Sequence, residues 1–161
     1  MVAVSAAGLT PKEATRLARL RVLVTAGGTR EALDPVRYLG NRSSGKQGIA
    51  VARAVADAGA VAHLVLAHAE VPAPQPTTTL SLSRVSSALQ LRERVGELIR
   101  QEAPDVVVMA AAVADFRPVA VAESKIKKGD EGPAPIHLTT NPDILRGLVT
   151  ARDEGRIPTA T

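Results

Sequence analysis

The sequence predicts an α/β protein built on a doubly wound, mainly parallel sheet with helices on both faces. Two runs of residues, "RVLVT" at 21–25 and "PDVVVMAAAV" at 104–113, are rich in branched aliphatic side chains and do not alternate with polar ones. Segments with helical spacing of apolar residues separate such runs along the chain. Hydrophobic residues make up 45% of the 161 residues but aromatic residues only 1%, so the core must be aliphatic. Parallel strands that are buried on both faces have this composition, and the expected fold is Rossmann-like.

The N-terminal residues contain a helix-start signal. Thr10 can cap the helix, Pro11 suits its first position, and Glu13 completes a capping box. We therefore predict a short helix to about Leu20. Residues 1–20 either belong to the fold or are the remnant of a linker from an upstream domain, and the main domain is expected to start at residue 21.

The middle of the chain alternates strands with helices. After the strand at 21–25, residues 45–58 carry apolar residues at helical spacing and stop at Gly59, which predicts a helix. A second strand is expected at 61–67. A short third strand is expected at 80–83, beyond a surface loop that contains several prolines.

The last strong pair of elements is a helix over 86–102 and a fourth strand within 104–113. Beyond this strand the periodicity is lost, so 116–133 is predicted to be a flexible loop or lid. A strand is then possible at 136–140, and a helix over 141–149 is predicted to be entered through its Asn-Pro pair. The helix over 86–102 is expected to turn these residues towards the core: Leu89, Val95, Leu98 and Ile99.

The composition excludes several classes of function. The chain has no cysteine, so it can form neither disulfides nor a thiolate metal site. The net charge of +4 is scattered, and two aromatic residues are too few for a single-stranded nucleic-acid platform. No apolar run reaches the roughly 18 residues that a membrane span needs, and the apolar start lacks the basic leader of a signal peptide. We expect a cytoplasmic protein that binds neither nucleic acid nor membranes.

Two polar motifs follow the first strand. Gly27 and Gly28 in "TAGGTRE" lie where ligands bind in open α/β sheets, although an isolated Gly-Gly is more often a plain strand-to-helix turn. Ser43, Ser44 and Gly45 in "NRSSGKQG" stand at a helix start, where hydroxyls and amides can bind a phosphate. The alternative is a well-capped helix with one of the serines as the cap.

Three further motifs lie in the second half of the chain. Asp115 in "AAAVADF" can accept from a sugar hydroxyl or help to hold a metal, or it is an ordinary loop carboxylate. The cations of "KIKKG" suit a polyphosphate or form a solvated patch. The "NPDI" segment is a second helix start that can face a ligand or merely be capped. By contrast, His63, His68 and His137 lack metal-ligand spacing, and no Ser–His–Asp constellation is visible.

Together these motifs resemble one family, the synthetase part of bacterial phosphopantothenoylcysteine synthetase/decarboxylase. They cover about residues 21–150 and read, in order, "VLVTAGGTREALDPVRYLGNRSSGKQG", "MAAAVADFRP", "KIKKG" and "NPDIL". The resemblance implies a ligase of coenzyme A biosynthesis that uses CTP and Mg2+. Such an enzyme activates 4'-phosphopantothenate as an acyl-cytidylate with release of pyrophosphate, and cysteine then displaces CMP to give 4'-phosphopantothenoylcysteine. A site with cations and backbone donors but no evident nucleophile suits this chemistry.

The resemblance also implies roles for individual residues, although it identifies no metal ligand. Asn41 matches the asparagine that holds the acyl intermediate, and Lys125 matches the nucleotide-binding lysine of a mobile lid, supported by Lys127 and Lys128. Our physical interpretation of Gly27, Gly28, Ser43, Ser44 and Gly45 is that they cradle phosphate or substrate groups. The other matched positions are expected to bind the nucleotide: Met109, Ala110, Ala111, Asp115, Asn141, Pro142, Asp143 and Ile144.

Two features of the family have no counterpart in this sequence. Family members continue with another strand and further nucleotide-binding lysines, and the bifunctional proteins carry a fused flavin-dependent decarboxylase domain. We therefore expect residues 21–161 to be a synthetase domain truncated at its C-terminal end, and to form a homodimer as in the family.

Two other functions stay open. A truncated domain that binds CTP without turnover would bind the nucleotide but release no pyrophosphate. A dehydrogenase-like protein would bind NAD, but the Gly-x-Gly-x-x-Gly fingerprint and a suitable acidic residue after the second strand are absent.

Overall fold

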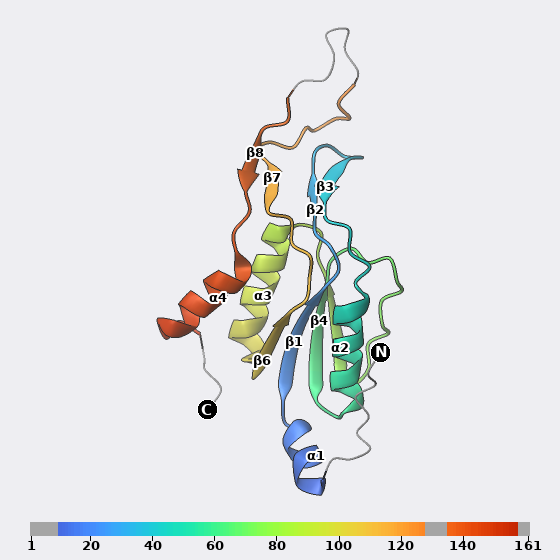
Figure 1. Ribbon diagram of the computed structural model, residues 1–161, viewed down its shortest axis with the longest axis vertical. Coiled ribbons are helices and arrows are strands. Elements are labelled where there is room, and N and C mark those ends of the chain that lie inside the picture. The colour runs from blue at the N-terminus through green and yellow to red at the C-terminus, as the bar shows by residue number, and fades with distance from the viewer. Residues whose placement is uncertain (1–9, 128–134, 158–161) are drawn as a thin grey trace.

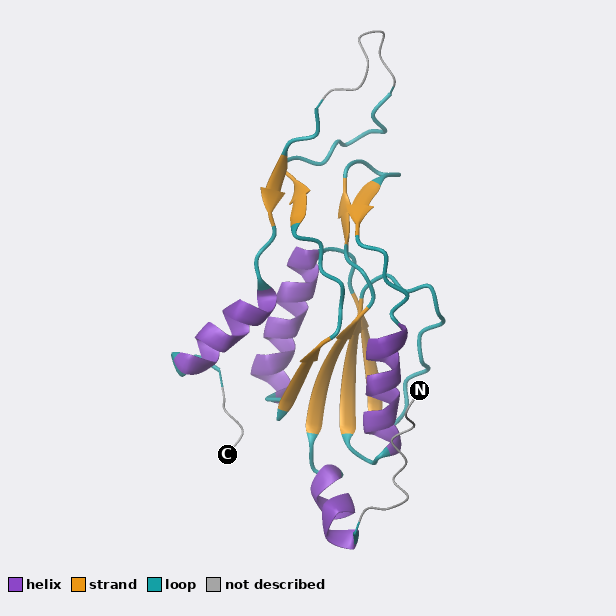
Figure 2. Cartoon of the chain, viewed as in Figure 1, coloured by secondary structure: helices purple, strands orange, loops and turns teal. Residues whose placement is uncertain are grey.

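The computed structural model describes residues 10–127 and 135–157, and its centre is a four-stranded parallel sheet in the order β5-β4-β1-β6. β1 pairs in parallel with β4 on one side and with β6 on the other, and β4 pairs in parallel with β5. All four strands point towards the same end of the molecule, the upper end in Figures 1 and 2. The strands are β1 (Arg21–Ala26), β4 (Val61–Leu66), β5 (Leu80–Arg84) and β6 (Val106–Met109).

Helices cover both faces of this sheet, because successive residues of each strand point to opposite sides. Val22 and Val24 of β1 pack in a cluster with α2, while Leu23 packs in a second cluster with α3 and the start of α4. Figure 1 shows α2 on one side of the sheet and α3 and α4 on the other. The doubly wound α/β prediction is therefore confirmed. The covering helices are α2 (Lys46–Asp57), α3 (Ala88–Glu102) and α4 (Ile144–Asp153).

The first helix, α1 (Pro11–Leu17), starts at the predicted capping box. The amide of Thr10 donates to Oε2 of Glu13 (2.8 Å), and the amide of Glu13 donates back to Oγ1 of Thr10 (3.3 Å). The helix ends before Leu20 and lies below the amino ends of the strands in Figure 1. Residues 1–9 of the predicted N-terminal segment lie outside the described part.

Two antiparallel ribbons rise from the carboxyl end of the sheet (Figure 2). β2 (Arg30–Ala32) pairs with β3 (Tyr38–Gly40), and β7 (Phe116–Pro118) pairs with β8 (Leu138–Thr140). We did not predict β2 and β3, and β7 corrects the prediction that 116–133 is a loop throughout. These strands have three residues each, too few to show an alternating pattern. The strand considered at 136–140 is confirmed in part as β8, and residues 128–133 of the predicted lid lie outside the described part.

Two details of the helices also differ from the prediction. Leu89 of α3, expected in the core, is 37% exposed, whereas Leu91 is fully buried. The helical pattern was therefore read two residues out of phase at this end. At α4 the cap is not Asn141 but Asp143, whose Oδ1 accepts from the amide of Arg146 (2.9 Å). Within the described part of the chain, no helix is both long and apolar enough to cross a membrane.

Candidate functional site at the carboxyl end of the sheet

Two buried threonines join the glycine turn after β1 to the segment after β6. Oγ1 of Thr25 accepts from the amide of Ala111 (3.2 Å), and Oγ1 of Thr29 accepts from the amide of Ala114 (2.9 Å). The carbonyl of Gly27 also accepts from the amide of Ala112 (2.7 Å). Both threonine side chains are fully buried, so these bonds form away from water and fix the two segments side by side. The site is thus built on a rigid edge of the sheet.

The segment after β6 lines a pocket of about 420 Å³, which we call the β6 pocket. Met109, Ala111 and Asp115 form one side of it, and the segment 141–144 forms the other. Seven of the nine residues expected to bind nucleotide therefore share one cavity, and Ala110 and Lys125 are the two that do not line it. Ala110 is not in its lining, and its amide donates to the carbonyl of Thr25 (3.2 Å).

Asn141 connects the two sides of the β6 pocket. Its amide group donates to the carbonyl of Ala114 (2.8 Å), and its backbone N–H donates to the carbonyl of Asp115 (2.7 Å). Its Oδ1 accepts from Nη1 of Arg117 (3.2 Å), which also donates to the carbonyl of Thr140 (2.6 Å). Both polar atoms of the buried Asn141 side chain are therefore hydrogen-bonded to protein groups. These bonds connect the two sides of the pocket and stabilise its geometry.

The glycine turn is packed too closely for any side chain. A Cβ on Gly27 would lie 2.6 Å from the carbonyl oxygen of His68, and the φ of Gly27 is 82°. A Cβ on Gly28 would lie 2.6 Å from the carbonyl oxygen of Asn41, and the Gly28 amide already donates to the carbonyl of His68 (2.8 Å). These glycines allow a close approach of backbones, and the Gly28 amide is not free for a ligand.

The start of α2 is capped by Gly45 and not by a serine. Gly45 has a φ of 72°, and as a glycine it has no side chain to accept a hydrogen bond from the first amides of the helix. Instead the Ser43 hydroxyl accepts from the Gly45 amide and the Ser44 hydroxyl accepts from the Lys46 amide, each at a long 3.4 Å. The serine-capped alternative is therefore wrong, and the two hydroxyls lie at the helix start with only weak partners.

A second cavity of about 180 Å³ lies beside the glycine turn, and we call it the glycine-turn pocket. Asn41 and Ser43 line it, and Nδ2 of Asn41 donates to the carbonyl of Val113 (3.0 Å), which lines the β6 pocket. Asn41 thus stands between the two cavities. Gly27, Ser44 and Gly45 are not in the lining. The complete lining is Gly28, Arg30, Tyr38, Gly40, Asn41, Arg42, Ser43, His68, Ala69 and Glu70.

His68 is a titratable residue of this pocket that sequence reasoning did not select. Its Nε2 lies 3.0 Å from Oγ of Ser86. Burial, and to a smaller extent the positive charge of Arg30, lower the pKa of His68 below its usual value. His68 follows β4 directly, at the carboxyl edge of the sheet where ligands bind, and this position in the sequence could have identified it.

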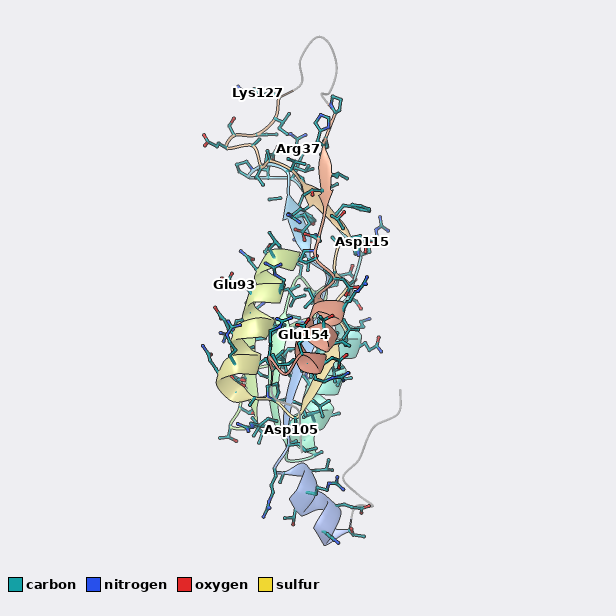
Figure 3. All side chains as sticks on the ribbon, turned by 90° about the vertical axis from the view of Figure 1, so that its left-hand side faces the viewer. Arg37, Glu93, Asp105, Asp115, Lys127 and Glu154 are labelled. Atoms are coloured by element: carbon teal, nitrogen blue, oxygen red, sulfur yellow. The ribbon has the colours of Figure 1, made fainter. Side chains whose placement is uncertain are left out.

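The lysines of the predicted lid are described only in part. Lys125 and Lys127 are exposed and line neither pocket, and Lys128 lies outside the described residues. Figure 3 shows Lys127 near the end of the molecule formed by the ribbons, well away from Asp115. The structure therefore does not place Lys125 or Lys127 in a pocket with the other predicted site residues.

A buried carboxylate, missed by sequence reasoning, fixes the loop that carries Lys125. Oδ2 of Asp34 accepts from the amide of Ile126 (3.1 Å) and from Nη2 of Arg37 (2.7 Å), and Arg37 also donates to the carbonyl of Ile126 (2.7 Å). Burial alone would raise the pKa of Asp34, but hydrogen bonds from the Arg37 side chain and from three backbone amides outweigh it and hold that pKa well below its usual range. We call this arrangement of Asp34, Arg37 and Ile126 the Asp34 clasp.

The structure also contains a Ser–His–Glu row that the sequence did not reveal. Nδ1 of His63 lies 3.0 Å from Oε1 of Glu102, and its Nε2 lies 2.8 Å from Oγ of Ser83. None of the three lines either pocket, and Ser83 also accepts from Nε of Arg94 (3.0 Å). The row connects β4, β5 and α3, away from the candidate site. Across the described residues, no group of three acidic, histidine or cysteine side chains is arranged to hold a metal ion.

Known proteins share both the sequence and the fold of this chain. Residues 17–159 match the family model described as the DNA/pantothenate metabolism flavoprotein C-terminal domain. The chain is 53% identical over 143 residues to the coenzyme A biosynthesis bifunctional protein CoaBC of Mycobacterium tuberculosis (strain ATCC 25618 / H37Rv), with 88% of this chain covered. It is 40% identical over 141 residues to CoaBC of Escherichia coli (strain K12), with 85% covered. It spans 33% of the length of each relative.

The fold agrees with these matches. The crystal structure of the C-terminal domain of CoaBC superposes with a TM-score of 0.65 at 36% identity, covering 81% of this chain and 59% of that one. The relatives are named as bifunctional proteins of coenzyme A biosynthesis, which agrees with the resemblance drawn from the motifs. With a family model that matches residues 17–159, this chain belongs to the family of the DNA/pantothenate metabolism flavoprotein C-terminal domain.

Proposed function

We propose that this chain is the synthetase domain of a phosphopantothenate–cysteine ligase, which uses CTP to join 4'-phosphopantothenate and cysteine. One observation carries the proposal: Asn41 lies between two cavities at the carboxyl edge of the sheet. It lines the glycine-turn pocket, and its Nδ2 donates to Val113 of the β6 pocket (3.0 Å). A reaction with an activated intermediate needs a polar group at the point where two substrates meet, and Asn41 would have this role if the two cavities hold the two substrates.

The β6 pocket suits the nucleotide. Its volume of about 420 Å³ lies in the range of small-molecule sites. The small side chain of Ala111 leaves room for a flat base beside the backbone, and the exposed Asp115 carboxylate can accept from a ribose hydroxyl. The choice of CTP over ATP comes from the family resemblance.

The proposed chemistry has two steps. In the first, a carboxylate oxygen of 4'-phosphopantothenate attacks the α-phosphorus of CTP, and the bond to the β-phosphate breaks to release pyrophosphate. In the second, the amine of cysteine attacks the acyl carbon, and CMP leaves with the electron pair of the broken C–O bond. Asn41 would hold the acyl-cytidylate through the second step, and Lys125 would stabilise negative charge in the first.

Magnesium binding would depend mainly on the nucleotide. Mg2+ is usually held by one or two carboxylates together with substrate phosphates, so a site without three acidic ligands fits this mode. Asp115 is the carboxylate of the β6 pocket that is free of protein partners in the described residues, since Asp143 caps α4. We therefore assign Asp115 as the protein ligand. When bound, Mg2+ would neutralise phosphate charge.

The lid and the phosphate cradle remain parts of the proposal. Lys127 and Lys128 would add positive charge beside Lys125 at the phosphates of the nucleotide. The Asp34 clasp holds Ile126, the residue between Lys125 and Lys127. Gly27, Gly28 and Gly45 would contribute by letting backbones approach closely. The hydroxyls of Ser43 and Ser44 would donate hydrogen bonds to phosphate oxygens.

A homodimer is the proposed assembly. The ribbons and the adjoining loops leave large apolar side chains in solvent, which monomeric proteins usually cover. Partner contacts on this surface would bury them. We also propose a cytoplasmic location and, in a full-length protein, a fused flavin-dependent decarboxylase. The exposed apolar residues are Val36, Tyr38, Phe116, Val119, Val121, Ile126, Ile136 and Leu138.

The test is pyrophosphate release that depends on CTP and Mg2+, measured with 4'-phosphopantothenate, with and without cysteine. Wild type should release pyrophosphate, and Lys125→Gln should release it more slowly. Asn41→Asp should still release pyrophosphate but make little 4'-phosphopantothenoylcysteine. ATP in place of CTP tests the choice of base, and Lys12→Gln, far from the site, serves as a matched loss of one lysine.

The principal alternative is a module that binds CTP without turnover. Nucleotide binding without pyrophosphate release would support that module and contradict the ligase. Absence of both binding and release would contradict both functions. Binding of NAD in preference to CTP would instead support the dehydrogenase-like reading.

A further inference from the structure

The glycine-turn pocket contains two arginines that have no carboxylate partner among the described residues. Arg30 and Arg42 both line it, and neither forms an ion pair there, although Glu70 lines the same cavity. The guanidinium of Arg30 stacks 4.3 Å above the ring of Tyr38. Stacking fixes the plane of the guanidinium but uses none of its five N–H donors, which are therefore available to a ligand. A pocket with unpaired guanidinium groups is suited to a phosphate.

His68 lines the same pocket. Its backbone is fixed because its carbonyl accepts from the Gly28 amide (2.8 Å) and its amide donates to the Gly28 carbonyl (3.1 Å). Its Nε2 lies 3.0 Å from the Ser86 hydroxyl, which can donate to a neutral ring or accept from a protonated one. Nδ1 has no partner among the described residues, so it is the ring nitrogen that can meet a ligand.

We propose that Arg30, Arg42 and His68 form the binding site for a phosphate or pyrophosphate group of the nucleotide, and that His68 takes up a proton when this group binds. The inference rests on the proposed function, because it names further residues for the nucleotide of that reaction. Four charged or titratable groups line the cavity with His68: Arg30 of β2, Tyr38 of β3, Arg42 after β3, and Glu70 of its own loop.

The direction of the proton transfer follows from these charges. In the free protein, burial and Arg30 both disfavour the charged ring, which lowers the pKa of His68. A bound phosphate places at least one negative charge between Arg30 and His68, which offsets the arginine and favours imidazolium. Affinity for the phosphate should therefore rise as pH falls from 8 to 6, by up to about tenfold if the pKa of His68 moves up by about 1 pH unit.

The experiment is an NMR titration of the histidine rings, with and without inorganic pyrophosphate. The sequence has three histidines, so His68→Gln and His137→Gln assign their signals. We expect the pKa of His68 to rise by about 1 pH unit with saturating pyrophosphate. The ring signals of His137, which is exposed and lines neither pocket, should be unaffected by pyrophosphate and serve as the internal control. The pKa itself is read on the wild-type chain, and the variants serve only to assign its signals.

Binding measurements then test the arginines. Arg30→Gln should weaken pyrophosphate binding about tenfold or more at every pH, whereas His68→Gln should weaken it only below about pH 7 and remove the pH dependence due to this site. Arg84→Gln, an arginine outside both pockets, is the matched control. An unchanged pKa of His68 at saturating pyrophosphate, or equal binding by wild type and Arg30→Gln, would overturn the inference. If pyrophosphate raises the pKa of His68 but no ligase product forms, the proposed function fails and this site stands.

Discussion

The parallel sheet and the two ribbons above it use large apolar side chains in opposite ways. In the sheet and its helices most such residues are buried, as Leu64 of β4 and Leu91 of α3 illustrate with no exposed surface, and the exceptions, such as Val61 and Leu89, are few. In the ribbons and their loops they are exposed, and Val119 is 64% exposed. The two aromatic residues of the chain, Tyr38 and Phe116, both lie in the ribbons and are both exposed.

This difference shows that the two regions are held by different interactions. The sheet is stabilised by burial of aliphatic side chains, each contributing about 1.5–3 kcal/mol. The ribbons have no comparable core and are joined by polar contacts, chiefly the Asp34 clasp and the bond from the Ala122 amide to the Leu33 carbonyl (3.0 Å). Their apolar side chains are therefore available to a partner, whereas those of the sheet are not.

The largest effect should come from the sheet. Leu64→Ala removes a fully buried side chain and should lower the free energy of unfolding by about 3 kcal/mol. Val119→Ala should lower it by less than about 0.5 kcal/mol in the monomer. Urea unfolding at several protein concentrations measures both. The loss of unfolding free energy in Leu64→Ala should not vary with protein concentration. Any loss in Val119→Ala should vary, because association adds stability by mass action. Equal losses at all concentrations would show that the two regions do not differ.

The next effect concerns assembly. Placing carboxylates on the exposed apolar surface, with Val36→Asp and Val119→Asp together, should convert a dimer into a monomer because charges would be buried without partners. Light scattering should give twice the chain mass for wild type and the single mass for the double variant. Val61→Asp, an exposed valine at the amino end of β4, is the control and should stay dimeric. A monomeric wild type would contradict the proposed dimer.

A smaller and local effect is expected for the Asp34 clasp. Asp34→Asn removes the ion pair with Arg37, so the Ile126 amide should exchange its hydrogen about tenfold faster while Leu64 is unchanged. Glu97→Gln, which breaks the similar i,i+3 pair with Arg94, should alter neither amide. Hydrogen exchange read by NMR distinguishes these outcomes, and equal protection of Ile126 in wild type and Asp34→Asn would mean that the ion pair does not hold the loop.

The pH dependence of the clasp follows from the sign of its pKa shift. The folded pKa of Asp34 lies well below the usual value of 3.8, so its contribution is fully present above that value. It is lost only as pH falls further, through the folded pKa. Wild-type protection of Ile126 should therefore persist at pH 4. Loss of the protection of the Ile126 amide between pH 6 and pH 4 would show that the pKa of Asp34 is not lowered.

The same contrast explains how much of the fold followed from the sequence. β1, β4, α2 and α3 were predicted within one or two residues, because burial imposes a period on long elements. β2, β3 and β7 were missed, since three-residue strands have no period and their pairing depends on contacts distant in sequence. The phase error at Leu89 has another cause, since the start of α3 is set by the Ser87–Gln90 capping box, with the Glu31 carboxylate accepting from the Ala88 amide (2.9 Å).

The candidate site divides in a similar way. Seven of the eleven residues that line the β6 pocket were predicted, because they lie in two motifs that follow a strand and begin a helix and because the family resemblance matched them. Thr25 and Asp34 were not found, because a threonine in an apolar strand and an aspartate before a proline look ordinary until their partners are placed. Lys125 was selected by resemblance, and its position outside both pockets depends on a loop that sequence patterns do not describe.

The smallest effect is expected where the two regions meet, at His68. Its folded pKa lies below the usual value of 6.5, so below pH 6.5 the unfolded chain binds a proton that the folded chain does not. Stability should therefore be retained above pH 6.5 and decline as pH falls through 6.5 towards the folded pKa. In His68→Gln this decline should be shallower than in wild type, as measured by urea unfolding between pH 7.5 and 5. The carboxylates titrate alike in both proteins. The difference between the two slopes of unfolding free energy against pH therefore reports on His68 alone. Pyrophosphate should reduce that difference if the anion raises the pKa of His68, and identical slopes without pyrophosphate would show that the histidine is not shifted by the fold.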